Sequence, residues 1–335
     1  MELTTRPLGK TGMDITLVGF GAWAAGGGGW AFSWGPQDDQ ESIAAVRHAV
    51  EAGVNWVDTA AVYGLGHSEE VVGAAMDGIP AADRPYIFTK GGLVWDESDR
   101  YKPSRRVGAP ESIRSGAEDS LRRLKVETID LYQLHWPAED GTPIEEYWGA
   151  LLQLKQEGKA RAVGLCNHNV AQLEVAEAIG HVDSLQPPFS AVKRATAPEL
   201  VWCSTHSTGV IIYSPMQAGL LTGAFSPERV ANLHQDDWRK RDPQFQGENL
   251  ERNLALAEKL RQIGEKRDVG PGPVAIAWAL EWPGVTGAIV GARSPAQVDG
   301  WLPAASLDLT AAELDEVSAA IESTGAGFGP SRPPR

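Results

Sequence analysis

Eight short apolar runs, most of them followed by an amphipathic helical pattern, constrain the fold of this chain more than any other feature of its sequence. The runs are rich in β-branched residues and cover 17–20, 54–57, 86–89, 129–134, 162–165, 184–186, 210–213 and 288–290. Most are apolar throughout, as expected for strands covered on both faces. Helical periodicity is present at 39–52, 68–76, 110–124, 144–157, 170–179, 198–207, 250–264, 274–280 and 311–321.

Strands that alternate with helices pair in parallel through right-handed crossovers. Eight such units predict an α/β fold, a single (β/α)8 TIM barrel. An open doubly wound sheet is the alternative.

The chain reads as one domain, because no linker rich in Ser, Gly or Pro divides it. We expect the barrel to cover 1–324 and a Gly/Pro-rich tail, 325–335, to be disordered. Residues 3–16 predict a short N-terminal hairpin. Two long loops, 26–36 and 214–247, follow the first and seventh strands, on the C-terminal face where barrel active sites form.

The composition argues against several classes of protein. The 335 residues carry a net charge of −14, which disfavours binding to nucleic acid or to an anionic membrane surface. The two cysteines, Cys166 and Cys203, lack the spacing of a disulfide framework or a zinc site. The N-terminus has no apolar signal stretch, and no run is long enough to span a bilayer. We therefore expect a cytoplasmic protein, and the sequence does not indicate its oligomeric state.

Three consecutive predicted strands each end in one ionisable residue: Asp58, Lys90 and His135. Neighbouring strand ends in a barrel lie about 5 Å apart, so these side chains are expected to converge on one rim. Tyr63 lies five residues beyond Asp58, in a turn that can fold back over that rim. Taken singly, each has an ordinary interpretation: a helix cap, a surface amine, a core histidine and a loop aromatic. Their joint placement favours catalysis.

These four residue types together suit proton donation to a carbonyl oxygen. A free phenol has a pKa near 10, and an adjacent cation lowers it. Lys90 can supply that cation while Asp58 orients it, so that Tyr63 becomes a usable general acid. His135 can polarise the carbonyl through its N–H. The hydride must come from a cofactor, since no side chain can deliver it.

The familiar cofactor and metal motifs are missing from the sequence. No G-x-G-x-x-G follows a strand, so a Rossmann site is unsupported. There is no H-E-x-x-H and no G-x-S-x-G, and the seven histidines have no metal-ligand spacing. We expect no metal site.

Several motifs resemble those of the aldo-keto reductase family. They are Asp58-Thr59-Ala60-Ala61-Val62-Tyr63-Gly64 with Gly66-His67-Ser68-Glu69-Glu70, then Thr89-Lys90, then Asp130-Leu131-Tyr132-Gln133-Leu134-His135. The likeness runs from about Leu8 to Ile321, and the loops suggest a bacterial branch similar to inositol-pathway reductases and potassium-channel β subunits. It implies that Asp58, Tyr63, Lys90 and His135 are the catalytic tetrad.

The resemblance also implies NADPH extended across the C-terminal face of the barrel. The residues that match its cofactor motifs are Gly21, Trp23, Asn167, Gln186, Tyr213, Ser214, Pro215, Gly219, Leu220, Gly223, Gly291, Arg293 and Gln297. Arg293 can fork onto a 2′-phosphate, which favours NADPH, with NADH as the alternative. Three positions depart from the family pattern: Cys166 and His168, expected at the nicotinamide end, and Gly300-Trp301, near the adenosine end.

The sequence therefore predicts an NADPH-dependent reductase of aldehydes or ketones, reversible as an alcohol dehydrogenase. Five tryptophans could line its substrate pocket: Trp23, Trp30, Trp34, Trp95 and Trp136. One alternative is a redox-sensing regulatory subunit that binds NADPH and turns over slowly. Another is an unrelated barrel enzyme, such as a metal-dependent hydrolase that uses Asp58 and His135.

Overall fold

A computed structural model describes residues 3–334 and contains a closed barrel of eight parallel strands. Around the barrel the strand order is β10-β11-β12-β3-β4-β5-β8-β9, closing on itself. The strands are β3 (Val18–Gly21), β4 (Trp56–Asp58), β5 (Tyr86–Gly91), β8 (Ile129–Leu134), β9 (Ala160–Cys166), β10 (Ser184–Gln186), β11 (Gly209–Tyr213) and β12 (Val285–Gly291). All eight predicted strands and the (β/α)8 class are confirmed, and the open sheet is excluded.

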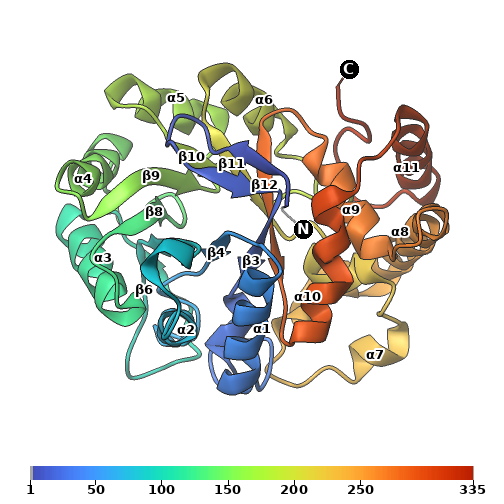
Figure 1. The fold of residues 1–335 in the computed structure, drawn as a ribbon, viewed down its shortest axis with the longest axis horizontal. Helices are drawn as coiled ribbons and strands as arrows, with labels where there is room; N and C mark the ends of the chain where they lie inside the picture. The colour runs from blue at the N-terminus through green and yellow to red at the C-terminus, as the bar shows by residue number, and fades with distance from the viewer. Residues whose placement is uncertain (1–2, 335) are drawn as a thin grey trace.

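Helices surround the strands as an outer ring (Figure 1). They are α1 (Asp39–Glu51), α2 (His67–Ala75), α3 (Pro110–Leu124), α4 (Ile144–Gln156), α5 (Val170–Ile179), α6 (Ala197–His206), α7 (Pro227–Ala231), α8 (Gly247–Glu265), α9 (Pro271–Leu280), α10 (Pro295–Trp301) and α11 (Ala311–Thr324). The short α7 and α10 were not predicted, because neither is long enough to show a helical period. Among the described residues, no helix is long and apolar enough to cross a membrane.

The barrel interior is filled by side chains rather than open. Its apolar cluster includes Leu8 and Met13 from the N-terminal hairpin, together with Trp56 and Phe88. The hairpin, β1 (Thr5–Pro7) and β2 (Asp14–Thr16), is antiparallel as predicted and closes the N-terminal end of the barrel. A side chain at Gly19 would overlap the Trp56 indole, since a Cβ there would lie 2.1 Å from that ring. The glycine therefore makes room for the largest interior residue.

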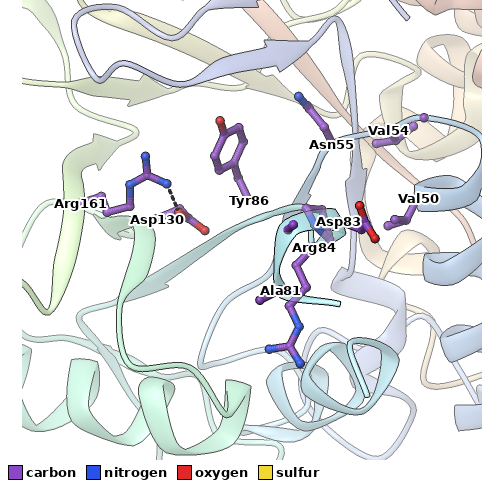
Figure 2. A pocket seen from close by; sticks show the side chains of 12 residues that line it. Val50, Val54, Asn55, Ala81, Asp83, Arg84, Tyr86, Asp130 and Arg161 are labelled. Atoms are coloured by element: carbon purple, nitrogen blue, oxygen red, sulfur yellow. Dashed lines mark hydrogen bonds and ion pairs between the residues drawn. The ribbon is translucent and has the colours of Figure 1, made fainter. Parts of the chain in front are cut away.

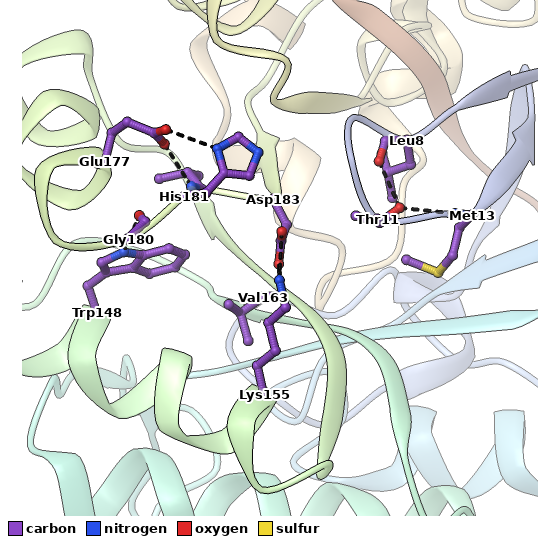
Figure 3. A network of polar contacts seen from close by, with 11 residues as sticks. Leu8, Thr11, Met13, Trp148, Lys155, Val163, Glu177, Gly180, His181 and Asp183 are labelled. Atoms are coloured by element: carbon purple, nitrogen blue, oxygen red, sulfur yellow. Dashed lines mark hydrogen bonds and ion pairs between the residues drawn. The ribbon is translucent and has the colours of Figure 1, made fainter.

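Charged groups on the N-terminal face form structural pairs. Asp183, just before β10, accepts from Lys155 Nζ at 2.6 Å and from the Val163 amide at 2.9 Å (Figure 3). A shallow pocket on the same face is lined by Tyr86, Asp130 and Arg161, among others (Figure 2). There the Arg161 guanidinium donates to Asp130 at 2.8 Å. These contacts join strand starts, at the opposite end from the predicted site.

The described residues of the Gly/Pro-rich tail contact the segment around Arg194. Arg194 is 3% exposed, and its guanidinium donates to the carbonyls of Ala326 and Gly329, both at 3.2 Å. The backbone of Phe328 exchanges hydrogen bonds with Val192 and Arg194. A Cβ at Gly327 would lie 1.8 Å from the Val192 carbonyl, so only glycine permits this approach. The glycines thus allow close packing of the tail on the chain.

Candidate active site

The predicted site residues gather at the C-terminal rim of the barrel because each lies where a strand ends. Asp58 is the last residue of β4, Lys90 the penultimate residue of β5, and His135 the first residue after β8. The rim continues through Asn167, just after β9, and Tyr213, the last residue of β11. The sequence pattern therefore locates these groups correctly on one face.

Asp58 and Lys90 form a buried ion pair at the centre of the rim. Lys90 Nζ lies 2.5 Å from Asp58 Oδ1 and also donates to the Thr59 carbonyl at 2.7 Å. Gln186 Nε2 donates to the other Asp58 oxygen at 2.9 Å. Burial opposes the charge on Lys90, but the Asp58 carboxylate outweighs it and raises the pKa of the ammonium. Lys90 is therefore a permanent cation at neutral pH.

Tyr63 lies over this pair on the turn after β4. The Ala61 amide bonds to the Lys90 carbonyl at 3.1 Å, which draws the turn toward β5. At Gly64 the backbone has φ of 64°, and a Cβ would lie 2.2 Å from the Gly26 carbonyl oxygen, so glycine is required. Lys90 Nζ lies 5.2 Å from the centroid of the Tyr63 ring. The geometry brings phenol and ammonium together as the sequence predicts.

The acidity of Tyr63 differs from the sequence expectation. Burial raises the pKa of Tyr63 to about 12, and the Lys90 charge opposes that rise without reversing it. Desolvation of the phenolate thus outweighs the cation. The side chain is a neutral phenol at neutral pH, which is the form that can donate a proton.

His135 packs edge-on against Tyr63, with ring centroids 5.6 Å apart. Burial, together with the positive charges of Lys90 and Arg106, lowers the pKa of His135 well below its usual value. The imidazole is therefore neutral, and its Nδ1 is buried without a hydrogen-bond partner among the described residues. A neutral imidazole beside a phenol carries one N–H, which suits hydrogen bonding to a carbonyl oxygen.

The carboxamides expected at the nicotinamide end are held firmly in place. Asn167 Nδ2 donates to the His135 carbonyl at 2.9 Å, and Tyr213 Oη donates to Asn167 Oδ1 at 2.8 Å. The backbone N–H of Asn167 donates to the backbone carbonyl of Gln186 at 3.2 Å. Each carboxamide nitrogen carries two hydrogens, so Asn167 and Gln186 each keep one for a ligand.

The residues expected toward the phosphate and adenosine end lie farther round the same rim. Gly21 and Gly291 end the adjacent strands β3 and β12 and are paired in register. The segment after β11, which holds Ser214, Pro215, Gly219, Leu220 and Gly223, has left-handed backbone at Ser214, Gly219 and Gly223. Leu220 is fully buried, so its side chain packs in the core and does not line the rim.

Arg293 is tied to the first long loop. Its Nε donates to Gln37 Oε1 at 2.6 Å, and its backbone amide donates to Gln297 Oε1 at 2.8 Å. A second nitrogen of the guanidinium donates to the Pro36 carbonyl. The cation is thereby fixed in orientation at the edge of the rim.

The three departures from the family pattern are not equivalent. Cys166 is buried near the Asp58–Lys90 pair, and burial raises the pKa of its thiol. His168 is 2% exposed and bonds to Tyr147 of α4, away from the rim, so the expectation that it touches the nicotinamide is wrong. His168 lies two residues beyond the end of β9, where the chain has already turned outward from the rim. Trp301, the last residue of α10, is buried in the main apolar core.

The five predicted substrate tryptophans lie in three different places. Trp23 stacks on Tyr63 with centroids 5.7 Å apart, and Trp34 meets Trp23 edge-on at 5.2 Å. Trp136 lies beside His135 in sequence and beneath the Arg106 guanidinium, and the half-buried Trp95 follows the short strand β6 (Leu93–Val94). Trp30 is 3% exposed and bonds to Gly27 within its own loop, so its role there is packing.

Trp238 belongs to this aromatic group and was missed by the sequence analysis. It stacks on Trp23 at 5.3 Å and meets Trp34 edge-on at 5.5 Å. Its backbone amide bonds to the Ser33 carbonyl, which joins the two long loops above Tyr63. A tryptophan within the long 214–247 loop was the available signal, but nothing in the sequence pairs it with Ser33.

The site as a whole offers a neutral phenol beside a permanent cation, a neutral imidazole, two carboxamides and a guanidinium at the far end. These groups can donate a proton to an oxygen, polarise a carbonyl, and hold an extended ligand with an amide at one end and phosphate at the other.

Known proteins are similar to this chain in sequence and in fold over nearly its whole length. The model of the "Aldo/keto reductase family" matches residues 17–322. The chain is 31% identical over 327 residues to aldo-keto reductase YhdN of Bacillus subtilis, covering 97% of this chain and 95% of that protein. It is 32% identical over 331 residues to the NADH-specific methylglyoxal reductase of Escherichia coli, covering 94% and 98%. The solved glycerol dehydrogenase of Gluconobacter oxydans is similar with a TM-score of 0.87 and 35% identity, over 97% of both chains.

Proposed function

The chain belongs to the aldo/keto reductase family, and from that premise we propose that it reduces an aldehyde or ketone to an alcohol with NADPH, Tyr63 donating the proton. Membership makes it a nicotinamide-dependent oxidoreductase of small carbonyl compounds. The observation that carries the finer proposal is the stack of Tyr63 over the buried Lys90–Asp58 pair. When bound, the reduced nicotinamide supplies the hydride.

Each residue has a separate task in this proposal. His135 directs an N–H at the carbonyl oxygen and sets its position beside Tyr63. As negative charge develops on that oxygen, the phenol transfers its proton, and the fixed Lys90 ammonium stabilises the phenolate that remains. Asp58 keeps Lys90 charged and oriented. In alcohol oxidation the phenolate takes the proton back.

The donor set of the rim suits a dinucleotide. Asn167 and Gln186 each retain one amide hydrogen for the nicotinamide carboxamide. Tyr213, at the end of the next strand β11, bonds to Asn167 and offers an aromatic ring for the nicotinamide to stack on. Arg293, oriented by Gln37, supports NADPH because a guanidinium can form two bonds to a 2′-phosphate. The Escherichia coli relative is named for NADH, so the choice of cofactor needs a direct test.

Replacing Tyr63 by Phe tests the proton donor. The variant should lose about 10²–10⁴-fold in kcat for carbonyl reduction, while the NADPH Kd, measured by fluorescence, stays within twofold. Tyr101→Phe, on an exposed loop, removes a phenol elsewhere and should change neither value. Tyr63→Phe turning over at the parental rate would reject the mechanism.

Replacing Arg293 by Leu tests the cofactor. Loss of a forked, charge-assisted pair should weaken NADPH binding by about 10- to 100-fold and leave NADH binding nearly unchanged. Equal losses for both cofactors would show that Arg293 does not read the 2′-phosphate.

A further inference from the structure

His168 forms a buried hydrogen-bond chain behind the rim. Its Nδ1 lies 2.8 Å from the Cys166 carbonyl oxygen, and its Nε2 lies 2.9 Å from the hydroxyl oxygen of Tyr147. Both side chains are only 2% exposed. Tyr147 belongs to α4, so these two hydrogen bonds link an outer helix to the end of β9.

The donors and acceptors in this chain are determined by their chemistry. A carbonyl oxygen can only accept, so His168 Nδ1 must carry a hydrogen. Burial lowers the pKa of His168 to about 4, so at neutral pH the imidazole carries only that one proton. Nε2 must then accept, and the Tyr147 hydroxyl donates to it. In this one arrangement both imidazole nitrogens of His168 have a hydrogen-bond partner.

The hydrogen bond from His168 holds the carbonyl of the Cys166–Asn167 peptide group. Asn167 has φ of 61°, in the left-handed region that costs energy for a residue with a side chain. From that conformation its side chain bonds to the His135 carbonyl and to Tyr213, while its amide bonds to Gln186. A rotation of the Cys166–Asn167 peptide would break all three contacts at once.

We propose that His168, with Tyr147 behind it, is a positioning residue that keeps Asn167 in its left-handed conformation and thereby sets the affinity for the nicotinamide end of the cofactor. The inference rests on the proposed function only in identifying the ligand of Asn167. The two side-chain hydrogen bonds of His168 go to the Cys166 carbonyl and to Tyr147, not to a side chain of the tetrad. An aromatic residue at 168 would supply the same packing without either hydrogen bond, so the imidazole contributes the hold on the Cys166 carbonyl.

Three variants separate hydrogen bonding from packing. His168→Phe keeps a ring but removes both bonds, and should raise the NADPH Kd about tenfold, with kcat at saturating NADPH and carbonyl changing less than twofold. Tyr147→Phe removes only the donor to Nε2 and should raise the Kd about threefold. Tyr132→Phe is the matched control, because Tyr132 is a buried phenol whose hydroxyl lies 3.5 Å from the Ile113 carbonyl on the outer side of β8. It should leave the Kd unchanged.

Crystal structures of the wild type and His168→Phe give a readout that does not depend on the cofactor. Asn167 should leave the left-handed region, or lose its bond to Tyr213, in the variant. Unchanged Asn167 geometry in His168→Phe, or an NADPH Kd equal to that of the wild type, would overturn the proposal. If the wild type binds neither NADPH nor NADH, the proposed function fails, and the Asn167 geometry alone then decides this inference. Tyr147→Phe preserves the test should His168→Phe not fold.

Discussion

Lys90 Nζ lies 2.5 Å from Asp58 Oδ1, and both side chains are almost wholly removed from solvent. A buried charge is tolerated when its partner is present, and removing one partner leaves the other uncompensated. We therefore expect the pair to be required for stability as well as for the proposed proton donation by Tyr63.

Asp58→Asn should lower the free energy of unfolding by about 3–5 kcal/mol, because the Lys90 ammonium would remain buried without its counter-charge. Urea unfolding followed by circular dichroism measures this loss. Asp130→Asn provides the comparison, since Asp130 pairs with the half-exposed Arg161 on the opposite face and the pair should contribute about 1 kcal/mol or less. Equal stability of Asp58→Asn and wild type would contradict the description of the pair.

The pH dependence of the two reaction directions should differ because Tyr63 has a pKa of about 12. Below that pH the phenol is protonated, so the acid form needed for reduction stays available from pH 7 to 10. The phenolate needed for oxidation increases about tenfold per pH unit over the same range. We expect kcat/KM for alcohol oxidation to rise with a slope near one on a logarithmic plot. A flat oxidation profile in this range would count against Tyr63 as the base.

Trp238→Ala should weaken substrate binding without destroying the fold. The change removes the stack on Trp23 and the edge contact with Trp34, which together hold the two long loops over Tyr63. We expect the KM for the carbonyl substrate to rise about 5- to 150-fold, since each of the two aromatic pairs contributes about 0.5–1.5 kcal/mol. Trp202→Phe on α6, remote from these loops, should leave the KM unchanged. The same increase in both variants would indicate a global effect.

The strands, and the placement of the four tetrad candidates at one rim, could be predicted because both depend on local sequence. A strand covered on both faces is apolar along its length, and the residue that ends it must lie at the rim, as Asp58 and Lys90 do. The pKa of Tyr63 could not be predicted in direction, since it depends on how deeply the turn is buried. That depth follows from the approach of Gly64 to Gly26 and from the cover by Trp23.

Other features depend on contacts between distant segments. Trp238 reaches the site through its bond to Ser33, and His168 turns away from it because Tyr147 of α4 offers a donor. The tail has a composition typical of disorder. Its carbonyls nevertheless accept hydrogen bonds from the buried guanidinium of Arg194. No pattern within either partner alone identifies these pairs.

Deleting 326–335 should destabilise the barrel although most of this segment has the composition of a flexible end. Arg194 would lose its hydrogen bonds to the carbonyls of Ala326 and Gly329, which should cost about 1–3 kcal/mol. Deleting only 332–335 removes the ion pair of Arg332 with the exposed Asp315 and should cost less than about 1 kcal/mol. Urea midpoints of the two truncations test the difference, and equal midpoints would show that the Arg194 contacts contribute nothing.

The stability of the protein should fall in mild acid because of its buried histidines. The pKa of His168 is about 4 in the folded state, against about 6.5 when unfolded. Between these values the unfolded chain binds a proton that the folded chain does not, so the free energy of unfolding decreases as the pH falls from about 6.5 to about 4. The maximal loss from His168 is on the order of 3 kcal/mol.

The His168→Phe variant tests this pH dependence. Its free energy of unfolding should fall less steeply with decreasing pH than that of the wild type, even though the variant is less stable at pH 7. Urea unfolding at pH 7, 6, 5 and 4.5 gives the slope of the free energy of unfolding against pH. Tyr132→Phe alters no histidine, so it should show the same slope as the wild type. Identical slopes for His168→Phe and wild type would mean that His168 is not held neutral in the folded protein.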